Sequence, residues 1–229
     1  MFGPALNETL YQEWDRHNPG NPYSASKSAA EMICLSYQNT YKLPLIIVNV
    51  MNAFGERQHP EKFIPLAIKA VMKGEKLFIH SYKDKTKAGS RFYIHGRNIA
   101  AAVLFLVKNG TIGEKYNISG EKEVDNLELA QFIAKCLDKP LNYEMVDFHS
   151  TRPGHDLRYG LDGTKLSEMG WQLPKNFEES LRNTVLWTAA NPKWLNIKEY
   201  AEDADIELYD PPEQAASRWA KEMPRQAKL

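Results

Sequence analysis

Tyr23 and Lys27 stand four positions apart at the start of a helical pattern, just after Asn21 and Pro22. On a helix, residues four apart lie one turn apart on the same face, so the phenol and the ammonium become neighbours. A positive charge favours the phenolate and lowers the pKa of a tyrosine, which suits it to accept a proton. The chain has 11 tyrosines, and chance alone supplies about one Tyr-x-x-x-Lys pair. A plain surface helix start is therefore the alternative, and the surrounding sequence has to decide.

Four motifs in chain order carry a family resemblance. They are Pro-Tyr-x-x-x-Lys at 22–27, Asn-x-x-Asn-x-Phe-Gly at 49–55, Pro-Glu-Lys-Phe-Ile-Pro at 60–65 and Arg-Pro-Gly-His-Asp-Leu-Arg-Tyr at 152–159. Together they resemble the extended short-chain dehydrogenase/reductase family, in its NAD-dependent nucleotide-sugar epimerase/dehydratase branch. The last two are similar to segments of the dTDP-glucose 4,6-dehydratases.

The resemblance implies NAD as cofactor and assigns roles to individual residues. Tyr23 would be the catalytic acid/base, and Lys27 would bind the nicotinamide ribose and tune the tyrosine. The side chains implied for the nucleotide sugar are Asn52, Lys62, Phe63, Arg91, Arg152 and His155. Arginine suits a diphosphate because its planar fork of donors matches two oxygens at once. Surface salt bridges are the alternative for the basic residues, and His155 could equally be a turn residue. No histidine cluster suggests a metal.

The reaction implied by the resemblance is a 4,6-dehydration of a nucleotide sugar. Hydride would leave C4 for NAD, water would be eliminated across C5 and C6, and hydride would return to C6. A related epimerase or decarboxylase is one alternative. The other is a non-catalytic relative that binds a nucleotide sugar or a full-length partner.

One family feature does not occur in the sequence. No Gly-x-x-Gly-x-x-Gly or Gly-x-Gly-x-x-Gly follows a strand, so no glycine-rich turn is available for the cofactor pyrophosphate. Residues 1–4 resemble the family's Val-Tyr-Gly-Pro, and the Thr-Asp-Glu that precedes it is expected before Met1. The chain therefore reads as a truncated or split C-terminal portion with a separate N-terminal half as a candidate partner. Alone, it is expected neither to bind NAD tightly nor to dehydrate a sugar.

The elements that must position these residues alternate between helix and strand. Ala29, Ile33, Tyr37 and Tyr41 form an apolar stripe on a helix predicted at about 26–42. The equivalent family helix forms a dimer interface, and packing within its own subunit is an equal alternative. A β-branched run at 43–50 is typical of a buried parallel strand. The almost wholly apolar helix predicted at 96–109 is expected to be buried.

The fold class expected is α/β, as the C-terminal half of a Rossmann-like doubly wound parallel sheet with a smaller α/β substrate-binding lobe. Residues 1–51 and 92–114 are expected to form the remainder of the dinucleotide-binding domain. Residues 52–91 and 115–197 are expected to form the substrate-binding lobe, and 198–229 a C-terminal extension.

Composition restricts the other classes of function. Lys and Arg together number 29, as do Asp and Glu, so the formal net charge is zero. This balance argues against nucleic acid or an anionic membrane as the main partner. The apolar run 99–107 is too short for a membrane span, and the N-terminus lacks a signal pattern. Cys34 and Cys136 are expected to be reduced core residues of a cytoplasmic protein.

Overall fold

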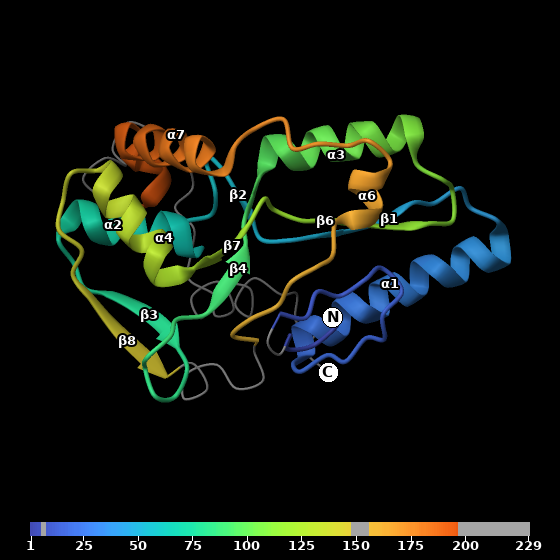
Figure 1. The fold of residues 1–229 in the computed structure, drawn as a ribbon, viewed down its shortest axis with the longest axis horizontal. Coiled ribbons are helices and arrows are strands. Elements are labelled where there is room, and N and C mark those ends of the chain that lie inside the picture. Colours follow the sequence, from blue (N-terminus) through green and yellow to red (C-terminus); the bar gives the residue numbers. More distant parts are fainter. Residues whose placement is uncertain (6–7, 148–155, 197–229) are drawn as a thin grey trace, which may run out of the picture.

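The computed structural model describes residues 1–5, 8–147 and 156–196, which form an α/β fold (Figure 1). Its helices are α1 (Pro22–Tyr41), α2 (Phe63–Lys73), α3 (Gly96–Asn109), α4 (Asn126–Cys136), α6 (Thr164–Glu168), α7 (Phe177–Ala190) and the 3-10 helix η1 (Pro192–Leu195). Its strands are β1 (Ile47–Val50), β2 (Ala53–Phe54), β3 (Leu77–Ser81), β4 (Ser90–Phe92), β5 (Ile94–His95), β6 (Lys115–Ile118), β7 (Glu123–Asp125) and β8 (Tyr143–Asp147). The predicted site residues Arg152 and His155 and the 198–229 extension lie outside the described residues.

Parallel pairing dominates the strands. β1 pairs with β6, β2 with β5 and β3 with β8, all in parallel, whereas β4 and β7 pair antiparallel. Helices α1 and α3 lie on opposite sides of the β1–β6 pair (Figure 1). Helices on both faces of parallel strands are the arrangement expected of a doubly wound fold, and the predicted α/β class is confirmed.

Two buried clusters form the core. One lies around β1, β6 and α3 and includes Met51, Leu106 and Tyr116. The other joins α2, α4, α7 and β3 on the left of Figure 1. Strand β6, which we expected in the substrate-binding lobe, pairs with β1 of the other region. The two-region division with its boundaries remains a prediction, and we propose that 115–118 belongs with β1.

Helix α1 begins at Pro22, earlier than the predicted start at about 26. The Asn21 side chain accepts a hydrogen bond from the Ser24 amide at 2.9 Å, and the Ser24 hydroxyl accepts one from the Asn21 amide at 3.2 Å. This reciprocal pair is a capping box, and proline suits the first helical position because it has no N–H to leave unpaired. The following strand is shorter than the predicted 43–50, since only 47–50 lie beside β6.

Apolar surface on α1 and α3 is more exposed than predicted. Leu104 and Val107 of α3 are 64% and 76% exposed, so the prediction of a buried helix is wrong for this face. The predicted stripe on α1 is exposed along its length, and Cys34 on the same helix is exposed rather than in the core. The physical reason is the width of the sheet. Within the described residues β1 pairs only with β6, and two strands are too narrow to cover either helix.

No helix in the described ranges combines the length and the hydrophobicity that crossing a membrane requires.

Candidate active site

A cavity of about 580 Å³ lies between α1, the segment 156–161 and β1 with the two residues that follow it. Its volume falls within the range of small-molecule sites. Polar side chains converge on it from both sides; they include Asn21, Tyr23, Ser24, Lys27, Asn49, Asn52, Arg91 and Tyr159. Asn52 lies just beyond the carboxyl end of β1. In doubly wound sheets, ligands bind at this end of the strands.

Tyr23 and Lys27 lie side by side on the first turns of α1. The Lys27 ammonium is 5.7 Å from the centre of the Tyr23 ring. Tyr23 is 68% exposed, so its hydroxyl is open to a ligand. Both side chains line the cavity. The geometry therefore places a phenol and a cation at one side of a space large enough for a small molecule.

Asn52 and Tyr159 also line the cavity, and neither belongs to α1. The Tyr159 hydroxyl donates a hydrogen bond to Asn52 Oδ1. Burial raises the pKa of Tyr159, although the neighbouring Arg91 charge and the hydrogen bonds from Arg91 and to Asn52 oppose this. The phenol is therefore held in its neutral form, as a donor. Because Asn52 accepts through its carbonyl oxygen, its amide nitrogen is left to donate elsewhere.

Arg91 reaches the cavity, but much of its hydrogen-bonding capacity is already used. Its Nη1 donates to the carbonyl oxygens of Ser90 and Leu157, and its Nη2 donates to that of Asp156. The guanidinium also lies 4.4 Å from the centre of the Tyr159 ring. An arginine has five N–H donors, and these contacts occupy most of them. Arg91 therefore holds the segment around Asp156 in place.

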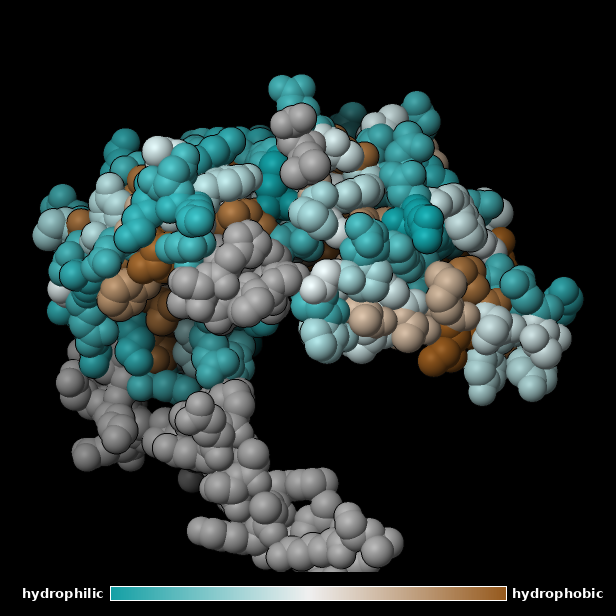
Figure 2. All heavy atoms as spheres, turned by 90° about the horizontal axis from the view of Figure 1, so that it is seen from below, coloured by the Kyte–Doolittle hydropathy of each residue, from teal (hydrophilic) through white to brown (hydrophobic). Residues whose placement is uncertain are grey.

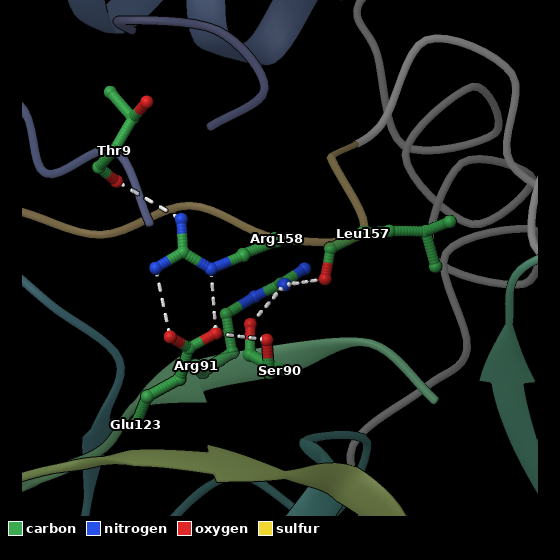
Figure 3. Close-up of polar contacts among 6 residues, drawn as sticks. All are labelled: Thr9, Ser90, Arg91, Glu123, Leu157 and Arg158. Atoms are coloured by element: carbon green, nitrogen blue, oxygen red, sulfur yellow. Dashed lines mark hydrogen bonds and ion pairs between the residues drawn. The ribbon is translucent and has the colours of Figure 1, made fainter. Parts of the chain in front are cut away.

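A second arginine fixes the same segment (Figure 3). Arg158 binds Glu123 through two parallel hydrogen bonds, Nε to Oε1 and Nη2 to Oε2, both 2.8 Å. Its Nη1 donates to the carbonyl oxygen of Thr9 at 3.0 Å, and the Ser90 hydroxyl donates to Glu123. These contacts join the N-terminal segment, the β4–β7 pair and the segment that carries Tyr159. A two-point arginine–carboxylate pair restrains both side chains in position and orientation.

Replacing Glu123 by glutamine is expected to reduce the free energy of unfolding at neutral pH by about 1–3 kcal/mol, because hydrogen bonds to a charged group are lost. Burial would raise the pKa of the Glu123 carboxyl, but the hydrogen bonds from Arg158 and Ser90 and the Arg158 charge outweigh it and lower the pKa below 4.5. The stabilisation is therefore present above the pKa of the unfolded chain and is lost as pH falls through the lower folded-state pKa.

Urea unfolding at several pH values measures this difference. The matched control is Glu178→Gln, since Glu178 pairs with Lys122 at an exposed site where such a bond contributes little. A wild-type advantage over E123Q that persists undiminished at pH 3 would contradict the assignment.

The structure brings four of the predicted site residues together and places two others outside the cavity. Tyr23, Lys27, Asn52 and Arg91 line the cavity together. Lys62 caps the start of α2 and is exposed, and Phe63 is packed against the other core cluster. Neither of these two lines the cavity, so their substrate-binding roles remain predictions.

Sequence reasoning did not single out Tyr159 or Asn49. Tyr159 ends the 152–159 motif and could have been found there as a buried tyrosine that needs a partner. Asn49 donates to Asn117 Oδ1 at 3.1 Å across β1 and β6. Asn49 could have been noticed because it is a polar residue inside a β-branched run. A polar side chain buried in a strand is expected to have a hydrogen-bond partner.

A parallel strand pair between helices, with a polar cavity beside β1, defines a doubly wound α/β protein, a class that binds ligands at the carboxyl end of its strands. A family model described as NAD dependent epimerase/dehydratase matches residues 1–119. The chain belongs to the NAD dependent epimerase/dehydratase family.

The individual relatives have more specific names than the family. The chain is 37% identical over 210 residues to dTDP-glucose 4,6-dehydratase of Escherichia coli, covering 88% of this chain and 57% of that protein. It is 39% identical over 197 residues to that of Haemophilus influenzae, with coverages of 82% and 57%. The crystal structure of dTDP-glucose 4,6-dehydratase from Bacillus anthracis in complex with NAD superposes with a TM-score of 0.76 and 32% identity. That match covers 85% of this chain and 60% of the other. The chain thus spans little more than half the length of these relatives.

Proposed function

We propose that this chain is the substrate-binding and proton-transferring portion of an NAD-dependent nucleotide-sugar 4,6-dehydratase. The observation that carries the proposal is that Tyr23, Lys27, Asn52 and Arg91 line one cavity, although three different elements carry them. The family match supports it, because residues 1–119, the part of the chain that the family model matches, contain all four residues.

NAD, when bound, takes up a hydride from the sugar and returns it. The residues present fit one part of this cofactor: Lys27 would hold the nicotinamide ribose, and its charge would favour the ionised form of Tyr23. Tyr23 would then take the proton of the sugar hydroxyl that is oxidised. Asn52 would orient the sugar nucleotide through its amide nitrogen, and Arg91 would neutralise the diphosphate. For the pyrophosphate of NAD, the described residues offer no glycine-rich turn between a strand and a helix.

A dinucleotide-binding half is therefore the partner that we propose, and its docking site is the edge of β1 that no strand of the described ranges covers, called here the open edge. The amides of Ile47 and Met51 donate to β6. Because amides alternate along a strand, those of Val48 and Val50 point to the open edge. Both valines are also partly exposed. A partner could add a parallel strand at this edge.

The apolar faces beside this edge favour the same partner. Leu104 and Val107 of α3 lie on one side of the sheet, and Met32 and Ile33 of α1 on the other. Figure 2 shows the apolar side chains gathered over α1. A sheet continued past β1 would cover both helices, as parallel sheets require. A second copy of this chain seated on α1 is the competing occupant.

The proposed function is tested by completing the protein. The half of the Escherichia coli relative that this chain does not span is joined in front of Met1 or supplied as a separate chain. We expect NAD binding by calorimetry and formation of a 4-keto-6-deoxy sugar from dTDP-glucose, neither of which the chain alone should give. Micromolar NAD affinity of the chain alone would contradict the proposed incompleteness. A completed protein that binds dTDP-glucose without turning it over would favour the non-catalytic alternative.

The docking site has its own test with the half supplied separately. Val48→Pro removes an amide that points to the open edge and leaves the β6 pairing intact. We expect it to abolish association measured by analytical ultracentrifugation. Val48→Thr keeps the amide and is the matched control. Equal association by both variants would place the partner elsewhere, and dimers of the chain alone would identify a second copy as the occupant.

A further inference from the structure

Helix α1 is held on the rest of the chain by very few buried side chains. Of its 20 residues, Ser24 and Glu31 are the buried ones. Ser24 belongs to the cap at the start of the helix, which leaves Glu31 as the buried group along its length. Glu31 lies one turn beyond Lys27 and two turns beyond Tyr23, on the same face of the helix. Ser28, Leu35 and Gln38 are only half-buried, so Glu31 is the most deeply buried side chain of the helix beyond its cap.

The partner of Glu31 is Lys115 on β6. Lys115 Nζ donates to Glu31 Oε1 at 2.8 Å, and the two side chains are only 3% and 4% exposed. The same ammonium lies 4.0 Å from the centre of the Trp14 ring. Among the ion pairs of the described residues, this is the one in which both side chains are almost fully buried.

His17 is a second neighbour of Glu31, with 3.5 Å between His17 Nε2 and Glu31 Oε2. Burial lowers the pKa of His17; the Glu31 charge opposes this, and the Lys115 charge adds to it. The imidazole is therefore neutral at neutral pH, and it packs edge-on against Phe2. Lys115 remains as the cation that balances the Glu31 carboxylate.

A buried charge without its partner is strongly unfavourable, so α1 can dock only where Glu31 meets Lys115. A shift of one residue along the helix would rotate the carboxylate by about 100° away from the ammonium. We propose that Glu31 and Lys115 are positioning residues that set the register of α1 on the sheet and thereby place Tyr23 and Lys27 at the cavity. The effect of this ion pair on catalysis rests on the proposed function. The anchoring of α1 to the sheet does not.

The anchoring is tested on the chain alone by amide hydrogen exchange. In Glu31→Gln, peptides from α1 should exchange about 10²-fold faster or more, because the Lys115 charge is left unbalanced and the helix opens locally. Peptides from α3 and α7 should keep their rates. The reversed pair Glu31→Lys with Lys115→Glu should restore protection of α1 to within about tenfold of the unaltered chain. This rescue distinguishes pairing from the loss of one side chain.

Three outcomes would overturn the proposal. One is unchanged exchange of α1 in E31Q, and another is acceleration of α1, α3 and α7 together, which would indicate general destabilisation. The third is a reversed pair that is no better protected than E31Q. None of these measurements involves NAD or a sugar. The proposed function can therefore fail in the completed protein while the anchoring stands, and the reverse also holds. If both stand, E31Q in the completed protein should lower kcat with little change in KM.

Discussion

Replacing Tyr23 by phenylalanine in the completed protein is expected to lower kcat by about 10²–10⁴-fold, the usual contribution of a positioned acid or base. The substitution removes one oxygen from an exposed ring, so neither the fold nor the apolar contacts of α1 should change. Nucleotide-sugar affinity should stay nearly the same, since Asn52 and Arg91, which line the cavity from other elements, are unchanged. Formation of the 4-keto product and calorimetric binding measure the two quantities.

Tyr37→Phe is the matched control for this experiment. Tyr37 lies on the same helix, is exposed like Tyr23, and does not line the cavity. Its substitution should leave kcat within about twofold, as expected for a surface change away from the site. Full activity of Y23F would contradict the assignment of Tyr23 as the base. Equal losses of kcat in both variants would indicate a general effect on α1.

Replacing Leu181 by alanine is expected to lower the free energy of unfolding by about 2–5 kcal/mol. Leu181 of α7 is fully buried in the cluster shared with α2 and α4, so the truncation leaves a cavity that its neighbours can only partly fill. Urea unfolding followed by circular dichroism measures the change as a lower midpoint at an unchanged slope.

Leu186→Ala provides the control on the same helix. Leu186 is 48% exposed, and its truncation should change the free energy of unfolding by about 0.5 kcal/mol or less. If the two variants lose similar stability, α7 does not pack through the face that the structure assigns to it. Neither substitution should affect the cavity, because neither residue lines it.

Local sequence patterns predicted the elements well because the residues that define them are close in the chain. The bounds of α3 agree with the predicted 96–109, since an apolar body with glycine at both ends is a local signal. Its burial could not be predicted in the same way. Exposure depends on how many strands lie beside the helix, and the periodicity of one helix carries no information about that.

In the candidate site too, contacts between residues close in sequence could be predicted, whereas contacts between distant residues could not. Tyr23 and Lys27 are neighbours because a single helix carries both. Their spacing was therefore sufficient to predict that the two side chains lie close together. Glu31 and Lys115 are 84 positions apart in sequence, and nothing in either local context indicates the other. Lys62 and Phe63 were assigned through a motif alone, and the tertiary fold places them away from the described cavity.

Among the described residues one edge of β1 has no partner strand, and this has a consequence for the amount of this chain that a cell can maintain. An exposed strand edge beside apolar helix faces is a template for aggregation, and folding cannot remove it while the partner strand is absent. Chaperones and proteases act on molecules that expose such surfaces. If the two halves are separate polypeptides, any excess of this one is expected to be degraded or to precipitate. Its steady-state abundance would then follow the supply of the half that covers β1.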